Sequence, residues 1–456
     1  MKHHPVTRIS KITAVLLLSI TVCNFVSAQQ PPQFEFSVKE SVEYAMKNST
    51  QVKNALININ VQEQTNREIT AAAYPQISGS GSMVRNLQVP VGVLPGDLMP
   101  GGTPGTFITI PFGTKYNSSY GASASQILFD GQVFVGLQAR RASMDYARLN
   151  VEVTTEQIKA NVQKIYYQLV VAKSQIATVD VNIERTKTLL NNTEQLYKNG
   201  FAERLDVDKV NVNLSNLNTE KVKLQNQIEA GYIGLKYLMG MPVQSTLILT
   251  DSLTEEEIKN NVIDEGEFDF NNRKEFQLLK TQEVLNEFNV KRYKYTYIPT
   301  LQLNANYTRN AFRTEFDLLK WGPRYPWYPT SFVGISINVP IFDGFGKDAR
   351  IKRSRFELMQ TRNNIEDTKN NINNEIETAK INIRSAIITM DEQKKNVELA
   401  ERVYNQTKLK YEQGLGSNIE ITTAEGDLKI AQNNYFSALY DAIVAKVDYL
   451  KATGKL

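Results

Sequence analysis

The chain contains two copies of one pattern, and this internal repeat restricts its possible folds more than any other feature. The motif Leu-Phe-Asp-Gly at positions 128–131 recurs as Ile-Phe-Asp-Gly at positions 341–344. A Tyr-x-x-Gly segment that ends at Gly200 recurs at almost the same spacing and ends at Gly414. A repeat of this length predicts two structural units of similar design, whose apolar faces are buried against one another.

Each copy carries a long segment without proline in which an apolar or aromatic residue returns every seven positions. Such a repeat keeps one stripe of a helix against its partner and gives a left-handed supercoil. We expect one long helix in each copy, at 132–199 and 346–413, each about 100 Å long. The series of the first copy are Leu137, Met144, Val151, Ile158, Ile165 and Ala172, and Val162, Leu169, Ile176, Ile183, Leu190 and Tyr197. Their counterparts are Ile351, Leu358, Ile365, Ile372, Ala379 and Ala386, and Ile376, Ile383, Met390, Val397, Tyr404 and Tyr411.

The long helices are each predicted to turn back into a shorter return helix. Gly200 and Gly414 suit the left-handed position that follows a helix. A shorter helix also opens each copy, and Ser37 is the expected cap of the first. Two short helices stacked end to end would match one long helix. The expected short helices are 38–72 and 272–295 at the openings, and 203–240 and 417–453 on the return.

Four segments change to strict alternation of apolar and polar residues, which is the period of a strand. In the clearest segments, 300–308 and 332–341, one face is consistently apolar. Two weaker segments, 77–85 and 116–129, follow the same rule. A sheet with one wet face in a soluble protein has this pattern, and so does a membrane barrel with a polar interior. The residues expected to face lipid are Leu301, Leu303, Tyr307, Val333, Ile335, Ile337 and Val339.

Positions 1–28 have the features of a cleaved export signal: basic residues, an apolar run and a final Val-Ser-Ala. They contain Cys23, the only cysteine, and both histidines. The mature chain therefore lacks both residue types, which excludes their use in catalysis, zinc sites or disulfides. The residue before Cys23 is valine, whereas a lipoprotein signal needs a small residue there, so we do not expect lipidation.

The mature chain carries almost equal numbers of basic and acidic residues, which gives no electrostatic reason to bind nucleic acid. After the signal, no apolar run approaches the ~20 residues of a membrane helix. An exported chain with two strand pairs at the ends of long helices favours the membrane barrel. Four strands are too few to close one, because bacterial barrels begin at about eight. Several copies must contribute; three would supply twelve strands, and the residues alone leave two or four open.

These features, in their order and spacing, resemble the TolC-type outer-membrane efflux family over nearly all of the mature chain. The resemblance implies a fold class of α plus membrane β-barrel: a homotrimer with a twelve-stranded barrel in outer-membrane lipid and a periplasmic tunnel of coiled-coil helices. The host would be a Gram-negative bacterium. The chain then divides into a signal peptide (1–28), a first repeat (29–240), a seam (241–270) and a second repeat (271–456). The repeats contain the strand pairs 77–129 and 298–341.

The resemblance also implies a function. Members are passive exit ducts for efflux, which work with a periplasmic adaptor (a membrane fusion protein) and an inner-membrane pump of the RND or ABC class. We therefore expect no enzyme activity, no cofactor and no metal. A type I protein-secretion channel is the alternative within this class, and a trimeric coiled coil with a structural or adhesive role is an alternative outside it.

In the family, the functional residues lie where the long helices turn at the inner end of the tunnel. The second-repeat turn carries Gly416 where the family often has an arginine that holds the end closed. An acidic ring at the aperture corresponds to Glu420 and, in the first repeat, to Asp206. A solvated carboxylate at a helix N-terminus is the alternative for Glu420. The turn residues expected to dock the adaptor are Tyr197, Gly200, Ala202, Leu205, Tyr411, Gly414, Gly416 and Ser417.

Overall fold

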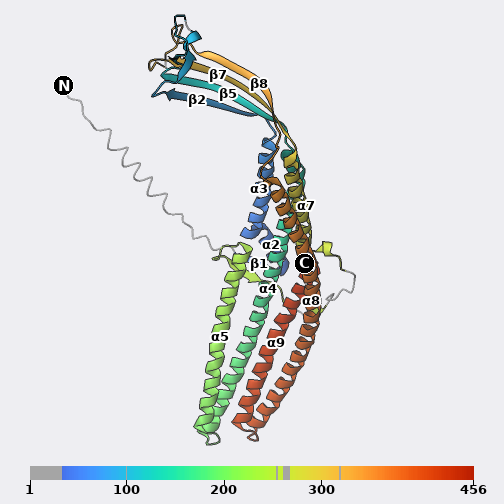
Figure 1. Cartoon of the computed structure of the whole chain (residues 1–456). Coiled ribbons are helices and arrows are strands. Elements are labelled where there is room, and N and C mark those ends of the chain that lie inside the picture. Colours follow the sequence, from blue (N-terminus) through green and yellow to red (C-terminus); the bar gives the residue numbers. More distant parts are fainter. Residues whose placement is uncertain (1–32, 99, 253–254, 260–267, 318–319) are drawn as a thin grey trace, which may run out of the picture. The chain divides into compact units, whose positions relative to one another are not determined.

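The computed structural model describes residues 33–98, 100–252, 255–259, 268–317 and 320–456 (Figure 1). The predicted signal peptide, with Cys23, lies outside the described residues. The chain forms two compact units, and neither is one continuous stretch. Unit 1 comprises Met1–Ala55, Val151–Arg273 and Asn370–Leu456, and unit 2 comprises Leu56–Asn150 and Lys274–Lys369.

Two helical hairpins build unit 1. The long helices α4 (Gly131–Lys198) and α8 (Gly346–Glu412) each start and end within one residue of the predicted bounds. Their return helices are α5 (Arg204–Met239) and α9 (Asn418–Ala452). Both hairpins turn at the same end of unit 1, at the bottom of Figure 1.

The seven-residue stripes form the core between these helices, as the sequence predicts. Five of the six residues of one α8 series are at most 6% exposed, namely Ile376, Ile383, Met390, Tyr404 and Tyr411. Near the turns, one apolar cluster draws on all four helices of the two hairpins. Its members are Leu189, Val210, Tyr404, Tyr411, Ile421, Ala424 and Leu428. The two hairpins are therefore packed on one another at this end.

The predicted opening helix 38–72 is wrong as a single element, because it breaks at Ser49. Helix α2 (Val38–Asn48) stops there and α3 (Thr50–Ala71) continues the chain. Ser49 has an extended ψ of 130° and is buried. The predicted cap is present: the Ser37 hydroxyl accepts from the Glu40 amide at 3.3 Å, and the Glu40 carboxylate accepts from the Ser37 amide at 2.7 Å.

The break belongs to a joint that occurs in both repeats. A Cβ at Gly240, after α5, would overlap the carbonyl oxygen of Asn48, so only glycine lets the chains approach this closely. After α9, Gly454 meets the carbonyl of Asn272 in the same way. In the second repeat, Asn272 is the last residue of the short 3-10 helix η2 (Phe270–Asn272), and α7 (Lys274–Lys294) follows it. The repeated joint therefore ends the return helix of each copy.

A two-stranded parallel sheet, which the sequence did not predict, connects the start of unit 1 to the seam. Strand β1 (Gln33–Phe36) pairs with β6 (Thr246–Leu249), which follows the first return helix. The Tyr166 hydroxyl of α4 donates to the Phe36 carbonyl at 2.9 Å and accepts from the Asp251 amide at 3.2 Å. The acidic run of the seam forms the short helix α6 (Glu255–Lys259), which packs on α9.

Unit 2 contains the four predicted strands in one antiparallel sheet of order β2-β5-β7-β8. Their bounds are Gln76–Arg85, Tyr116–Phe129, Thr300–Arg313 and Tyr328–Asn338. The last two strands are longer toward their shared loop than predicted, because β7 continues past residue 308 and β8 begins before 332. Val339 lies beyond the end of β8, so its expected place within a strand is wrong.

The segment between β2 and β5, residues 86–115, contains a further hairpin. Strands β3 (Val91–Pro95) and β4 (Phe107–Pro111) pair with one another, and a 3-10 turn, η1 (Gly96–Leu98), follows β3. In the loop between β7 and β8, the rings of Trp321 and Trp327 stack with centroids 5.5 Å apart. Trp327 also packs edge-on against Tyr120 of β5 at 4.9 Å. The aromatic residues thus fold this loop on itself.

Candidate functional site

The first candidate site is the apolar face of the sheet in unit 2. Directly paired residues of an antiparallel sheet lie on the same face. The register pairs Leu301 with Ile337 and Leu303 with Ile335, and the same face continues through Ala305 opposite Val333. It reaches β5 and β2 through further pairs of alanine, isoleucine and glycine. On β8 the apolar side chains are 63% to 75% exposed at Val333, Ile335 and Ile337.

The opposite face is polar and carries hydrogen bonds between the strands. The hydroxyls of Ser78 and Ser123 lie 2.8 Å apart, and those of Ser82 and Ser119 lie 2.7 Å apart. Between β7 and β8, the Asn304 amide donates to the Ser336 hydroxyl at 2.9 Å. One face therefore favours an apolar solvent and the other favours water, as the alternation predicts.

The second candidate site is the pair of hairpin turns in unit 1. Gly200 (φ 79°) and Gly414 (φ 72°) adopt the left-handed conformation expected after a helix. The amide that follows Gly200 donates to the Leu196 carbonyl at 2.8 Å, and the one that follows Gly414 donates to the Lys410 carbonyl at 2.9 Å. The two turns therefore have one geometry. Gly416 is half-buried, and its amide also donates to the Lys410 carbonyl, at 3.1 Å.

Both return helices start with a carboxylate in the first turn, at equivalent places. The Ser417 hydroxyl caps α9 by accepting from the Glu420 amide at 3.3 Å, while the Glu420 side chain is exposed. The Asp206 carboxylate accepts from the Glu203 amide at 3.2 Å and is half-buried. Asp206 therefore takes part in capping its own helix, whereas Glu420 projects into solvent. Whether either belongs to a ring stays a prediction.

The tyrosines at equivalent positions of the two turns differ. Tyr411 is 6% exposed, and its hydroxyl lies 3.1 Å from the Thr193 hydroxyl of α4. Thr193 uses its own proton on the Leu189 carbonyl at 2.8 Å, so Tyr411 donates to Thr193. Tyr197 is 42% exposed and is the outer end of its stripe. Of these two tyrosines, Tyr411 therefore forms a hydrogen bond between the two hairpins.

Large apolar side chains are exposed at both turns, and Leu205 is among the turn residues that the sequence predicts to dock the adaptor. Phe201 is 81% exposed directly after Gly200, and Leu415 is 78% exposed directly after Gly414. Ile419, the counterpart of Leu205, is exposed as well. The residue after such a glycine commonly packs back on its helix, so exposure here is the unusual feature. We call Phe201, Leu205, Leu415 and Ile419 the tip patch. Phe201 corresponds to Leu415 in the repeat, and Leu205 corresponds to Ile419, so the repeat in the sequence already contains this pairing of apolar residues.

The profile of the outer membrane efflux protein family matches residues 42–241 and 287–455 of this chain. The chain belongs to that family.

Individual relatives agree with this assignment. The efflux protein is 22% identical over 452 residues to the outer membrane efflux protein BepC of Brucella suis, covering 98% of this chain and 90% of BepC. It is 20% identical over 346 residues to the outer membrane protein TolC of Vibrio cholerae, covering 74% and 77%. Among solved structures, CusC has the same fold with a TM-score of 0.73 at 16% identity, covering 92% of this chain and 93% of CusC. The CmeC outer membrane channel of Campylobacter jejuni gives 0.70 at 17% identity, covering 92% and 85%.

This outer membrane efflux protein therefore has the predicted family, fold class, efflux function and outer-membrane location. The helical hairpins and the four strands are the parts that carry the fold. No helix among the described residues has both the length and the apolar character needed to span a membrane. In the same parts of the chain, His, Cys, Asp and Glu side chains form no group of three that could hold a metal ion.

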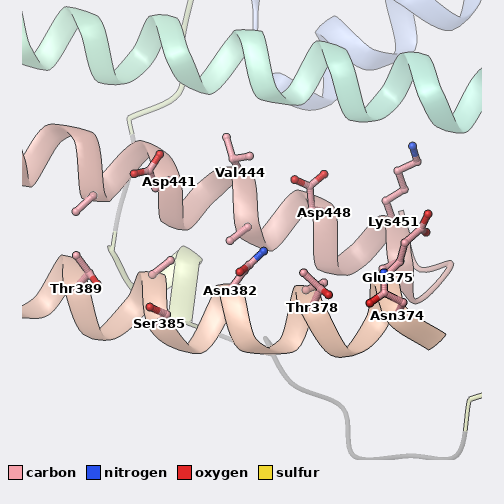
Figure 2. A pocket seen from close by; sticks show the side chains of 15 residues that line it. Asn374, Glu375, Thr378, Asn382, Ser385, Thr389, Asp441, Val444, Asp448 and Lys451 are labelled. Carbon is pink, nitrogen blue, oxygen red and sulfur yellow. The ribbon is translucent and has the colours of Figure 1, made fainter. Parts of the chain in front are cut away.

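A groove of about 650 Å³ lies between α8 and α9 of the efflux protein (Figure 2). Short polar side chains of α8, such as Thr378 and Asn382, line one side, and Asp441 and Asp448 of α9 line the other. Alanines from both helices supply much of the remaining lining. Asp448 is bound to Lys164 of α4 at 2.5 Å. The groove thus has a polar wall of small residues, which suits contact with water.

Proposed function

We propose that this efflux protein acts as a homotrimer, with twelve strands closing one barrel and the helices forming a tunnel. The observation that carries the proposal is the sheet of unit 2, which has one apolar face, one polar face and two edge strands, β2 and β8. Open edges leave backbone groups unpaired in lipid, and four strands fall short of the ~eight that a barrel needs. Pairing β8 of one copy with β2 of the next satisfies both requirements.

The trimer is proposed to be a passive exit duct. An inner-membrane pump, of the RND or ABC class, would deliver cargo through a periplasmic adaptor, and the duct would conduct it across the outer membrane. Serine, asparagine and threonine on the polar sheet face give the barrel a wet interior for this purpose. In this proposal the chain performs no chemistry on the cargo.

The decisive experiment combines extraction, oligomeric state and conductance of the mature protein. We expect it to fractionate with the outer membrane, to run as a detergent-resistant trimer and to conduct ions in planar bilayers. A chain that extracts without detergent and gives no conductance would be a coiled coil of structural or adhesive type, and the duct would be rejected.

The tip patch is the proposed docking surface for the adaptor. Burying a large apolar side chain contributes about 1.5–3 kcal/mol, and Phe201 and Leu415 are almost fully available for such contact. We expect Phe201→Ser and Leu415→Ser each to weaken adaptor capture in cells by about tenfold or more. Arg204→Ser, at an exposed polar residue of the same turn, is the matched control. Equal capture by all three variants would place docking elsewhere.

A further inference from the structure

The four strands of the sheet in unit 2 contain three charged residues, and all three are arginines: Arg85 of β2, and Arg309 and Arg313 of β7. Arg85 lies opposite Tyr116, which lies opposite Arg313, and Arg309 lies opposite Tyr120. Every second residue of a strand shares a face, so this register places all three arginines on the apolar face of the sheet. Charge on this sheet therefore has one sign and is confined to the face that we assign to lipid.

The three arginines lie toward the outer end of the sheet. Strands β2 and β7 begin shortly after the helices α3 and α7, and the arginines are near the opposite ends of these strands (Figure 1). On the same face, the residues from Leu301 to Tyr307 and their partners on β5 and β8 carry no charge. From Leu301 to Arg309 the strand rises about 26 Å along its own axis, which brings Arg309 to the outer part of an apolar band ~25 Å tall. Charge on this face therefore begins near the level at which the hydrocarbon ends.

Aromatic rings surround these charges. The loop between β7 and β8 lies against Tyr120 through Trp327, with ring centroids 4.9 Å apart, and through Trp321, at 6.3 Å. Phe316 of the same loop packs edge-on against Tyr116 at 5.7 Å. Because both tyrosines belong to the apolar face, the loop covers the outer end of that face. Tryptophan and tyrosine are enriched at this level of a membrane, between the hydrocarbon and the water.

Arg313 differs from the other two arginines, because its charge is satisfied inside the protein. It is 7% exposed, and its guanidinium lies 3.3 Å from the Asp317 carboxylate. It also donates to the Phe312 carbonyl at 3.0 Å and to the Pro326 carbonyl at 2.9 Å. Arg313 thus fastens the aromatic loop to the sheet and is not available to a ligand.

Three cations at this end have no carboxylate partner within the described parts of the chain: Arg85, Lys115 and Arg309. We call them the basic rim. Arg85 and Lys115 are exposed, and their charged groups lie 5.9 and 6.0 Å from the centroid of one ring, that of Tyr116. Arg309 donates from Nε to the Tyr307 hydroxyl at 3.0 Å, which leaves its terminal N–H groups for another acceptor. Two like charges at one ring repel, so an anion that contacts both is stabilised by both.

We propose that the basic rim binds phosphate groups of lipid headgroups in the outer leaflet of the outer membrane. Guanidinium groups bind phosphate through paired hydrogen bonds, and an ammonium group adds a point charge. The segments 85–116 and 309–328 carry six basic and three acidic residues, so the local charge also favours an anion. The aromatic rings lie at the level of the headgroups, and the apolar rows below them meet the acyl chains. That this face meets lipid rests on the proposed barrel.

Tryptophan fluorescence of the mature protein in neutral detergent tests the basic rim. The chain has two tryptophans, and both lie in the loop over the rim. The probes are phosphatidylcholine mixed micelles alone, the same micelles with diphosphorylated lipid A or with lipid A stripped of its phosphates, and inorganic phosphate. We expect phosphorylated lipid A alone to shift the emission and to stay on the protein during size-exclusion chromatography.

Substitutions then identify the cations. Arg85→Gln, Lys115→Gln and Arg309→Gln should each weaken binding of phosphorylated lipid A about fivefold, because one charge near an anionic lipid surface contributes about that factor. Lys115 lies outside the strands, so Lys115→Gln leaves the sheet intact. Arg355→Gln removes an exposed charge from α8 and is the matched control, which should bind as the wild type does.

Three results would overturn the basic rim. Equal binding of lipid A with and without phosphates would leave an aromatic contact alone, and equal affinity of all the variants would place the phosphate elsewhere. The same response to inorganic phosphate would replace the lipid by a free anion. Gel migration of the unheated protein separates these results from the proposed barrel, since a trimer that fails to distinguish the lipids contradicts the rim, whereas a chain that stays monomeric contradicts the barrel.

Discussion

Replacing Ile335 of β8 by arginine tests the face of the sheet that we assign to lipid. Ile335 is 63% exposed and lies directly opposite Leu303 on the apolar face. The next residue, Ser336, is exposed on the polar face, where its hydroxyl accepts from Asn304. Ile335→Arg and Ser336→Arg therefore place the same charge at nearly the same depth on opposite faces.

The magnitude follows from the cost of a charge in hydrocarbon. An arginine on the lipid face of a membrane strand costs about 2–4 kcal/mol near the midplane and less near the interfaces. Because Ile335 lies within β8 and away from its ends, we expect about 2 kcal/mol or more per chain. A trimer carries three copies, so the penalty for each assembled barrel is three times as large. Ser336→Arg meets water and should cost less than about 1 kcal/mol.

The assay is folding of the purified mature chain into lipid vesicles across a urea series, followed by gel migration of the unheated trimer. We expect the folding midpoint of Ile335→Arg to fall well below that of the wild type, while Ser336→Arg stays close to it. An equal or larger loss for Ser336→Arg would reverse the face assignment and refute the reasoning from strand register.

Three further predictions concern unit 1. Glu420→Gln should weaken the block of bilayer conductance by multivalent cations added from the periplasmic side, because ring carboxylates focus a negative potential; unchanged block would remove the ring. Tyr411→Phe should lower the free energy of unfolding by about 0.5–1.5 kcal/mol and speed hydrogen exchange at both turns, while Tyr197→Phe, at an exposed residue, should change both little. Equal effects of the two substitutions would contradict the difference in burial. Met390→Ala, at a fully buried residue, should lower the free energy of unfolding, measured in detergent, by about 2–5 kcal/mol. A loss below ~1 kcal/mol would place Met390 outside the core.

The parts that the sequence predicts well are those with a long, regular period. The stripe through Ile376, Ile383 and Met390 continues over many turns, so single exceptions do not obscure its seven-residue period. The bounds of the helices follow from the flanking glycines. The strand faces follow in the same way, because a period of two determines which residues share a face. These features depend on residues close together in the sequence.

The features that the sequence did not predict depend mainly on contacts between residues that are far apart in the chain. The helix break at Ser49 accommodates the close approach of Gly240, which lies at the other end of the first repeat. Strand β1 is very short, and its partner β6 lies beyond the whole first repeat. In the loop at 86–115, frequent prolines concealed the hairpin, since Pro95 and Pro111 both end strands.

Glu425 of α9 is buried, and it belongs to a polar pattern that the sequence contains. Asn418, Glu425 and Gln432 recur every seven residues along α9, beside its apolar stripe. Two of them meet α4, where Glu425 contacts Thr186 and Gln432 accepts from the Asn182 amide at 2.7 Å. A polar series in register with an apolar one predicts a buried polar seam, but only the packed structure shows which helix faces it.

The interleaved order of the two units has a consequence for biogenesis. All of unit 2 has been synthesised by Lys369, whereas unit 1 lacks its last third until Leu456. A nascent chain crossing the inner membrane thus exposes the apolar strands of unit 2 before the helices of unit 1 are complete. A holding chaperone would have to shield those strands, and nonsense mutations late in α9 would leave an aggregation-prone intermediate rather than a shortened duct.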